Sequence, residues 1–381
     1  MSAPRLLPGS AHFTVTELPA YEPSGTGEHL YVLIEKENLN TDQVAEALAA
    51  VSGKSFRDIG YAGRKDRHAI TAQWFSVLGA QDTALAGLAE RLPNGRITIR
   101  TVTRHGNKLR LGHLRGNRFR LGLADVDAGL ADRLDALVRD GVLNRFGPQR
   151  FGVNGATLRL AKAWGAGDYQ AACAAVVDPS DVWRWGEALP DGFRSGPEGR
   201  VLGALRRGAE AKAALRAAGD QMHKLVASAA QSAIFNAILD VRVAAGLVHR
   251  VRPGDLASTV KGAPFTVGPD EAESVSERCL RFDAFTTAPL PGSRRLTPSP
   301  EVDAEERAWA APTGIDWAWF LDRAVFDSPG ERRPLVMPFL EPPVLTPDGE
   351  VTWLDLALPA GGYATEALAQ CGVAVPTDRR G

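Results

Sequence analysis

The sequence predicts a globular protein of mixed strand and helix content, with strand patterns near both ends of the chain and a helical region between them. Its 381 residues are 44% apolar and 23% charged, a composition typical of globular proteins. Alternation of apolar and polar residues marks the first and last parts of the chain, whereas residues 156–246 are Ala-rich and helical in pattern. This length allows either one large domain or two ordinary ones.

Membrane, secretory and metal-binding classes find no support in the sequence. There is no apolar run of about 18 residues, and the first residues lack the basic flank and apolar stretch of a signal peptide. Cys173, Cys279 and Cys371 are far apart and in no CxxC or Cys/His spacing, so we expect small buried residues and no metal site. We therefore expect a cytoplasmic protein without membrane contact.

Periodicity places the elements of the first 150 residues. Strands are predicted at residues 12–17, 29–34, 71–78, 97–102 and 117–123, and helices at residues 42–51 and 128–139. The first helix has the clearest signals: Thr41 is the predicted N-cap, Val44, Leu48 and Val51 mark the buried side, and Gly53 ends it.

The rest of the chain begins with a loop at residues 144–152 that Gly and Pro interrupt. The last helix of the Ala-rich region, residues 224–245, is apolar on more than one side and should be well buried, at Ile234, Phe235, Ile238 and Leu239. A Pro- and Gly-rich region with short strands follows and ends near residues 331–334. Residues 351–359 form the last predicted strand, which a double glycine separates from a short C-terminal helix.

A basic stripe covers residues 91–124, which contain no Asp or Glu although the whole chain has a net charge of −1. Its cations are Arg91, Arg96, Arg100, Arg104, Lys108, Arg110, Arg115, Arg118 and Arg120. On strands, this spacing places cations on one face, which predicts a surface that contacts phosphates. A solvated face is the alternative.

The stretch YAGRKDRHAITAQWF, residues 61–75, places one acid among several cations. If it is extended, Arg64, Asp66 and His68 share a face, and the opposite charge favours an ionised carboxylate. Such a carboxylate is suited to act as a nucleophile or to stabilise a developing positive charge. A structural aspartate in a turn is the alternative, and spacing alone does not decide between them.

Several motifs resemble those of the TruD family of tRNA pseudouridine synthases. Gly63, Lys65, Asp66, Ala69, Thr71 and Gln73 match the pattern G-x-K-D-x-x-A-x-T-x-Q of that family. Further matches follow in family order: GNRF (116–119), NRFGPQRFG (144–152), SAIFN (232–236), PLPGS (289–293) and LPAGGYAT (358–365). The resemblance implies that Asp66 is the catalytic carboxylate.

The family's architecture implies an α+β fold with a mixed, mostly antiparallel sheet and flanking helices. The catalytic domain would be discontinuous, with residues 1–141 and 337–381, and residues 142–336 would form the insertion domain. The implied function is isomerisation of uridine 13 in the D arm of tRNA, without a cofactor or a metal. Direct attack on the ribose and a glycal-like route both remain open.

The resemblance also implies which residues bind the substrate. Phe13, Asn117, Phe119 and Tyr363 would hold the uracil, although core packing is the alternative for each aromatic residue. The candidates for contact with the RNA backbone are Lys65, Arg104, Lys108, Arg110 and Arg115. We expect His223, His249 and the Trp183/Trp185 pair to be packing or surface residues.

Other classes of function were weighed against the enzyme. A related protein that binds structured RNA without modifying it, as a folding aid, is the first alternative, and a protein-interaction scaffold is the second. The expected partner is tRNA, and we expect a monomer. Asp66 and Asn117 favour the enzyme, and the basic stripe argues against a scaffold that has lost RNA binding.

Overall fold

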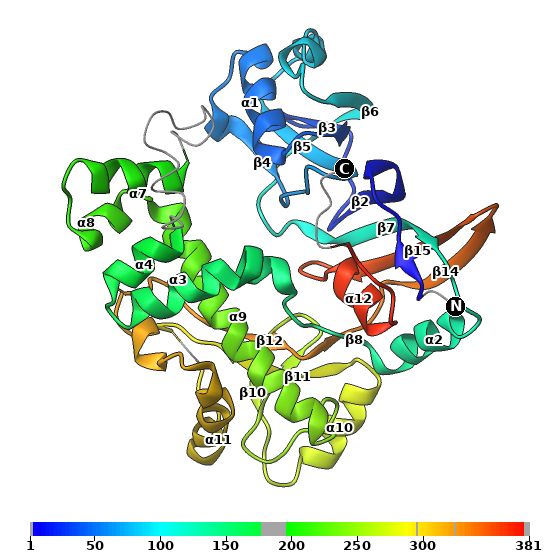
Figure 1. Cartoon of the computed structure of the whole chain (residues 1–381). Coiled ribbons are helices and arrows are strands. Elements are labelled where there is room, and N and C mark those ends of the chain that lie inside the picture. Colours follow the sequence, from blue (N-terminus) through cyan, green and yellow to red (C-terminus); the bar gives the residue numbers. More distant parts are fainter. Residues whose placement is uncertain (1–2, 177–195, 295, 324, 377–381) are drawn as a thin grey trace. The chain divides into compact units, whose positions relative to one another are not determined.

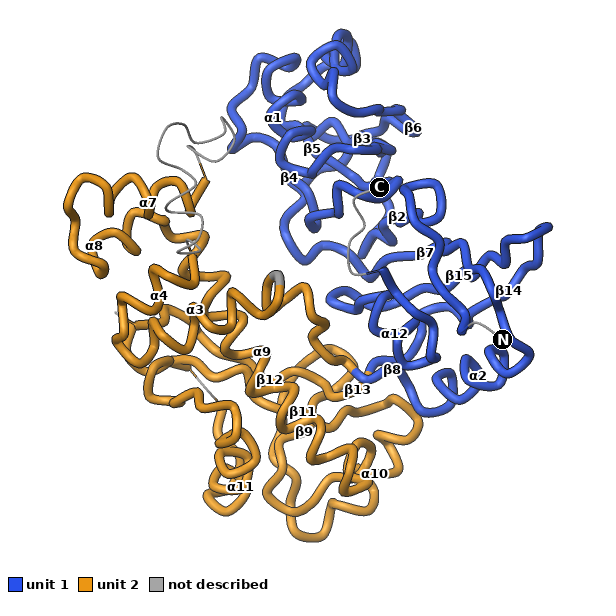
Figure 2. The backbone as a smooth tube through the Cα atoms, in the orientation of Figure 1, with its two compact units in different colours: residues 1–143, 337–381 blue, residues 144–336 orange. Residues whose placement is uncertain are grey.

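The computed structural model describes residues 3–176, 196–294, 296–323 and 325–376 (Figure 1). The chain divides into two compact units, residues 1–143 with 337–381 and residues 144–336, which we call unit 1 and unit 2 (Figure 2). The sequence analysis expected the boundaries between the two domains at residues 141/142 and 336/337. The Trp183/Trp185 pair lies outside the described residues.

Unit 1 is built on a nine-stranded sheet. Its main path runs β14-β15-β7-β2-β5-β3-β6, with β1 paired to β7 and β4 paired to β5. The strands are β1 (Arg5–Leu6), β2 (Phe13–Pro19), β3 (His29–Glu37), β4 (Ile59–Tyr61), β5 (Ile70–Leu78), β6 (Arg96–His105), β7 (Leu114–Ala124), β14 (Glu341–Asp348) and β15 (Val351–Pro359). Strands β2 and β5 pair in parallel, and the other pairings described in this sheet are antiparallel. The predicted α+β fold with a mixed, mostly antiparallel sheet is confirmed.

Helices cover the buried side of this sheet in two places (Figure 1). Helix α1 (Thr41–Ser52) packs with β3 and β5 in one apolar cluster, and α2 (Leu130–Asp140) and α12 (Ala364–Gln370) pack with β2, β7 and β15 in another. Four 3-10 helices complete the N-terminal segment: η1 (Ser10–His12), η2 (Phe56–Asp58), η3 (Asp82–Leu85) and η4 (Ala89–Arg91). The short strands β8 (Val142–Leu143) and β13 (Val336–Met337) lie where the chain leaves and re-enters unit 1.

Helix α1 starts one residue earlier than the sequence predicted. Asn40, not Thr41, is the N-cap, because its side chain accepts a hydrogen bond from the Gln43 amide while the Gln43 side chain accepts from the Asn40 amide. Thr41 is buried and its hydroxyl donates to Gln73 on β5. Gly53 ends the helix in the left-handed conformation at φ 64°, as predicted.

Unit 2 combines helices with a four-stranded sheet of order β10-β9-β11-β12. The α-helices among its described residues are α3 (Ala156–Gly165), α4 (Tyr169–Val176), α7 (Pro197–Arg206), α8 (Ala211–Arg216), α9 (Asp220–Ala244), α10 (Ala272–Leu280) and α11 (Pro300–Ala310). Its strands are β9 (Leu256–Thr259), β10 (Pro264–Thr266), β11 (Ala284–Leu290) and β12 (Glu331–Pro334). The prediction of a buried helix over residues 224–245 is confirmed, since Ile234, Phe235, Ile238 and Leu239 of α9 are fully buried.

Hydrogen bonds join two of the sequence motifs in unit 2, NRFGPQRFG (144–152) and SAIFN (232–236). The amide of Phe146, in the loop at residues 144–152, donates to Asn236 Oδ1 on α9 at 3.0 Å, and Asn236 Nδ2 donates to the Phe146 carbonyl at 2.8 Å. The Arg333 guanidinium lies 4.3 Å from the centre of the Phe146 ring. These contacts give the two motifs a packing role within unit 2.

Replacing Asn40 by Ala removes the side-chain acceptor of the α1 capping box and leaves the backbone amide of residue 40, which donates to Gln43, in place. We expect the free energy of unfolding to fall by about 1 kcal/mol in urea-induced unfolding. Glu46→Ala, an exposed position within the same helix, is the matched control and should change stability by less than about 0.5 kcal/mol. Equal stability of the two variants would contradict Asn40 as the N-cap.

Candidate active site

The sheet register brings polar residues of several strands together on one face. Glu17 on β2 lies directly opposite Asn117 on β7, and Lys36 on β3 lies opposite Thr71 on β5. Val15, two residues before Glu17 and on the same face, lies beside Thr71 in the parallel pair. Because opposite residues on adjacent antiparallel strands have Cβ atoms about 5 Å apart, these side chains form a polar row within a buried face.

Asp66 lies in the loop at residues 62–69, between β4 and β5, which borders this row. The segment does not continue as a strand through His68: the loop turns at Arg67 and His68, and Asp66 Oδ1 accepts a hydrogen bond from the His68 amide at 3.0 Å. Asp66 is exposed. Arg64 points to Asp42, at 3.3 Å, so the face that Arg64, Asp66 and His68 would share in a strand does not form.

The loop is fastened by contacts that the sequence did not predict, and one of the groups involved, Glu17, was not singled out there. Lys65 Nζ forms a buried ion pair with Glu17 at 2.9 Å, and the Lys65 amide donates to Thr41 Oγ1 at 2.9 Å. The Gln73 side chain connects helix α1 to the loop, because it accepts a hydrogen bond from the Thr41 hydroxyl at 2.8 Å and donates one to the Gly63 carbonyl at 3.1 Å. The backbone that leads into Lys65 and the Lys65 side chain itself are therefore held in place directly before Asp66.

Glu17 is itself fixed by the sheet. One carboxylate oxygen accepts from the Trp74 amide of β5 at 3.2 Å, and the other binds Lys65. With 3% of its surface exposed, Glu17 is a buried anion that has both a cation and a backbone donor. The signal that could have identified it is its position on β2, where Phe13 and Val15 set an apolar alternation that Glu17 continues.

Lys36 is a second buried cation beneath the loop, with 1% of its surface exposed. Its Nζ donates to the Leu39 carbonyl at 2.6 Å and to the Asp66 carbonyl at 3.3 Å. Burial lowers the pKa of Lys36 to about 8, while the charge of Asp66 acts to raise that pKa and Lys65 acts to lower it. A lysine in phase with the apolar residues Leu30, Val32 and Ile34 is the sequence signal that we missed.

Asn117 has an unused hydrogen-bond acceptor. Its Oδ1 is buried and has no hydrogen-bond partner among the described residues. The preceding Gly116 allows β7 and β15 to lie close, because a Cβ there would be 2.1 Å from the Leu358 carbonyl oxygen. An orphaned acceptor beside the Glu17–Lys65 pair indicates a place for an external donor.

Tyr363 lies near the same end of β7. The Ala360 amide donates to the Arg115 carbonyl at 3.1 Å, and the turn that follows closes through Gly362, whose amide donates to the Pro359 carbonyl at 3.0 Å. Tyr363 is the residue before α12, and 38% of its surface is exposed. Its ring is therefore accessible to a planar ligand.

Phe13 and Phe119 are core residues, which was the alternative for each of them. Both belong to the apolar cluster with α12, and their rings meet edge to face at 6.3 Å. Phe13 also lines a small pocket together with His68, two residues after Asp66. The two rings thus border the Asp66 loop, but their faces are largely covered.

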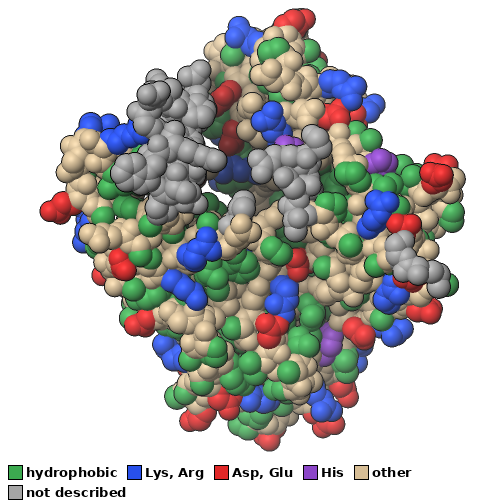
Figure 3. Space-filling model, in the orientation of Figure 1, with side chains coloured by type: hydrophobic (Ala, Val, Ile, Leu, Met, Phe, Trp, Pro, Cys, Tyr) green, Lys and Arg blue, Asp and Glu red, His purple; other side chains and the backbone are tan. Residues whose placement is uncertain are grey.

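Acidic side chains from other segments of the chain lie beside the cations of the basic stripe in the folded structure. Of its nine cations, all within the described chain, five form ion pairs with acids from other segments. The pairs are Arg96 with Glu37, Arg100 with Glu35, Arg104 with Asp82, Arg118 with Glu341 and Arg120 with Asp355. Acidic and basic side chains are accordingly interspersed on the face that Figure 3 shows.

The candidates for RNA contact separate into two groups. Lys65 is buried in its ion pair, Arg104 binds Asp82, and Lys108 Nζ donates to the Arg57 carbonyl. Arg110 and Arg115 are exposed and form no ion pair with the described residues. The backbone ties the loop of Arg110 to the candidate site, because the Gly112 amide donates to the Ala62 carbonyl at 2.8 Å.

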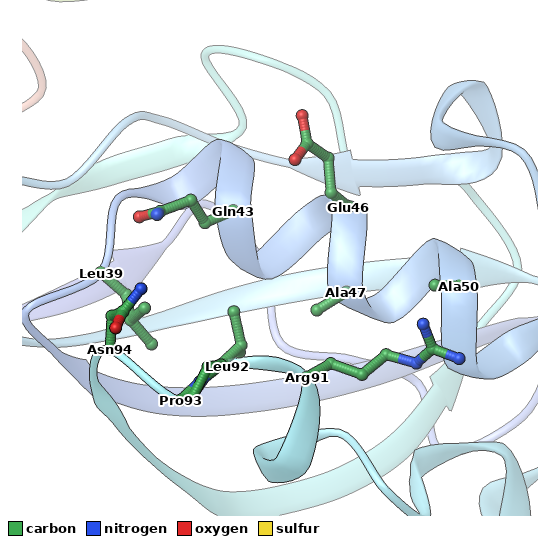
Figure 4. A pocket seen from close by; sticks show the side chains of 9 residues that line it. All are labelled: Leu39, Gln43, Glu46, Ala47, Ala50, Arg91, Leu92, Pro93 and Asn94. Atoms are coloured by element: carbon green, nitrogen blue, oxygen red, sulfur yellow. The ribbon is translucent and has the colours of Figure 1, made fainter. Parts of the chain in front are cut away.

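A separate pocket of about 330 Å³ lies beside α1 (Figure 4). Gln43 and Glu46 project from the helix, and Arg91 extends beneath it. None of the residues that line it is among the predicted site residues, and we assign it no function. In the described part of the chain, no group of three or more His, Cys, Asp or Glu side chains is suited to hold a metal ion, and no helix has the length and apolar character needed to cross a membrane.

Comparisons with known proteins agree over both units. A family model described as tRNA pseudouridine synthase D (TruD) matches residues 5–370. A Geobacter sulfurreducens protein named tRNA pseudouridine synthase D is 37% identical over 379 residues, which cover 93% of this chain and 90% of the relative. A Thermus thermophilus protein of that name is 34% identical over 361 residues, with 93% of this chain and 85% of the relative covered.

A solved structure shows the same fold. The crystal structure of a Methanosarcina mazei protein described as tRNA pseudouridine synthase D (TruD) matches with a TM-score of 0.72. The match covers 97% of this chain and 93% of the other, at 23% sequence identity.

Glu17→Gln leaves the Lys65 ammonium buried without its carboxylate. We expect the free energy of unfolding to fall by about 3 kcal/mol, measured by urea-induced unfolding. Adding Lys65→Met should restore much of this loss, because an apolar side chain of similar volume does not need a counter-ion.

The exposed pair of Arg5 and Asp125 is the matched control for this cycle. Asp125→Asn should lower the free energy of unfolding by less than about 1 kcal/mol, since exposed ion pairs contribute little. If Glu17→Gln is no more destabilising than Asp125→Asn, the buried pair does not fasten the loop.

Proposed function

Because this chain belongs to the tRNA pseudouridine synthase D (TruD) family, we propose that it isomerises uridine 13 in the D arm of tRNA, with Asp66 as the catalytic carboxylate. The chain is a pseudouridine synthase by family. The observation that carries the finer proposal is the fastening of the Asp66 loop, which presents an exposed carboxylate, through the ion pair of Lys65 with Glu17. Glu17 lies opposite Asn117, whose buried amide oxygen has no hydrogen-bond partner among the described residues.

The reaction sets the requirements for the site. The bond from uracil N1 to ribose C1′ must break, the uracil must turn while it stays bound, and a bond from C5 to C1′ must form. C5 loses its proton as it bonds to C1′ and N1 gains a proton, so that atoms and electrons balance without a redox partner or a group donor. The protein must therefore supply a carboxylate, contacts to the free base and exclusion of water from the sugar.

Asp66 meets the first requirement. Its side chain is exposed, while the backbone before it is held by Thr41, Gln73 and the Glu17–Lys65 ion pair. A fixed carboxylate does not need to reorganise when positive charge develops at the sugar, which lowers the barrier. The neighbouring cations have partners of their own, since Arg64 binds Asp42 and Arg67 donates to the Asn38 carbonyl.

Asn117 and Tyr363 suit the second requirement. A uracil edge offers N3–H as a donor, and Asn117 Oδ1 is an acceptor without a partner among the described residues. The accessible ring of Tyr363 is suited to stack on the extruded base, a contact worth about 1 to 3 kcal/mol. Phe13 and Phe119, packed edge to face, form the apolar support beside these groups.

Phosphate contacts are assigned to two of the candidate cations that form no ion pair with the described residues and lie next to the site. Arg110 and Arg115 are exposed, and the segments that carry them bind backbone groups of residues 62 and 360 next to the site. Lys65 and Arg104 instead hold carboxylates of the protein. We therefore propose that Arg110 and Arg115 contact the tRNA backbone and that Lys65 positions Asp66.

Asp66→Asn keeps the shape of the side chain but removes its charge. We expect the rate of pseudouridine formation in unmodified tRNA transcripts to fall at least about 1,000-fold, because no remaining group replaces the carboxylate. Affinity for tRNA should change less than about threefold, since phosphate contacts dominate binding. Pseudouridine is mapped at single-nucleotide resolution, and binding is measured in parallel.

Asp125→Asn is the control for this experiment, because it alters an exposed aspartate that pairs with Arg5. Wild-type protein and the control should modify one D-arm uridine at equal rates. Modification at another position would contradict uridine 13 but not the enzyme. Binding of tRNA without product, across a full tRNA pool, would favour the RNA-binding alternative.

Asn117→Ala removes the acceptor that we assign to the uracil N3–H. The expected result is a fall of about 10- to 100-fold in kcat/KM with tRNA affinity almost unchanged, because an unpaired polar edge of the base costs about 1 to 3 kcal/mol. Asn94→Ala, on the separate pocket beside α1, serves as the control. Wild-type kcat/KM in Asn117→Ala would rule out this role.

A further inference from the structure

Lys36 occupies a position where the sheet pattern calls for an apolar residue. Leu30, Val32 and Ile34 precede it on the same face of β3 and are all fully buried. Burying an ammonium group is unfavourable by several kcal/mol unless its surroundings compensate for the lost water. A cation kept in such a place indicates a role beyond packing.

The surroundings of Lys36 differ from those of the other buried lysine, Lys65. The Lys65 ammonium has the Glu17 carboxylate as its partner. The Lys36 ammonium donates to two backbone carbonyls, those of Leu39 and Asp66. The carboxylate whose charge favours protonated Lys36 is that of Asp66, and this attraction acts equally on both groups.

The two contacts of Lys36 connect opposite sides of the loop. The Leu39 carbonyl belongs to the turn between β3 and α1, whereas the Asp66 carbonyl belongs to the residue that carries the reactive side chain. Fixing that carbonyl fixes the peptide plane after Asp66, and so limits where its carboxylate points. Thr41, Gln73 and Lys65 hold the backbone before Asp66, and Lys36 holds the backbone after it.

We propose that the protonated side chain of Lys36 is a positioning residue for pseudouridine formation, which orients Asp66 through its backbone carbonyl and through the attraction between the two charges. This inference rests on the proposed function of Asp66. Lys36 acts from beneath the loop and does not touch the RNA. Loss of its charge should therefore slow the isomerisation and leave tRNA binding largely intact.

Single-turnover rates and tRNA affinities of wild type, Lys36→Met and Lys36→Arg test this role. Lys36→Met should lower the rate about 10- to 100-fold and change the tRNA Kd less than threefold. The matched control is Lys54→Met, a lysine of unit 1 outside the site, which should match the wild type in both measurements.

The dependence of the rate on pH separates positioning from simple packing. Lys36 is charged below its pKa, so the wild-type rate should be full below about pH 8 and fall as pH rises through that value. Lys36→Arg keeps its charge throughout this range and should lack that fall, even if its rate is lower overall. The charged groups that face Lys36 are Asp66 and Lys65, the latter neutralised by Glu17, and all remain present in both proteins.

The outcomes distinguish this inference from the proposed function. An active wild type with equal rates in Lys36→Met, or with the same alkaline fall in Lys36→Arg, would overturn the role of Lys36 alone. A wild type that forms no pseudouridine would overturn the proposed function and this inference with it. If Lys36→Met fails to fold, the pH profiles of wild type and Lys36→Arg decide by themselves.

Discussion

The buried ion pair between Lys65 and Glu17 is the interaction on which the arrangement of the site depends. It joins the residue directly before Asp66 to the central strand β2, whose other hydrogen bonds fix it within the sheet. The Lys65 side chain is 5% exposed and the Glu17 side chain 1%. Such a buried ion pair adds little to the free energy of unfolding, because the loss of water from both charges offsets much of their attraction. The pair fixes the position of the loop, because neither Lys65 nor Glu17 forms another ion pair with the residues that the structure describes.

Ion pairs also give the basic stripe acidic neighbours that its own sequence lacks. Strands distant in sequence are neighbours in the sheet, so Glu35 and Glu37 of β3 meet the arginines of β6, and Asp355 of β15 meets Arg120 of β7. An acid-free stretch of sequence is therefore not an acid-free surface. Exposed pairs of this kind are weak, and we propose phosphate contact for Arg110 and Arg115, which are exposed and form no ion pair in the described chain.

Stability and function oppose each other at Lys36. Burial lowers the pKa of Lys36, which means that the folded protein carries the ammonium at a cost in free energy at neutral pH. The neighbouring Asp66 reduces that cost by its charge. An apolar residue at this position of β3 would pack more favourably, which is the pattern expected where a functional group is held in an unfavourable environment.

The sequence by itself determined several of the strands, the buried helix α9 and the family, and it pointed to Asp66, because periodicity and short motifs are local properties. It did not determine the partners of the motif residues: Asn40 replaced Thr41 as the N-cap, and Phe13 and Phe119 proved to be core residues. Only the tertiary structure brought Glu17, Lys36 and Asn117 to the Asp66 loop. Their proximity depends on the register of strands β2, β3, β5 and β7, which pair across up to about a hundred residues of sequence, and local pattern does not encode that register.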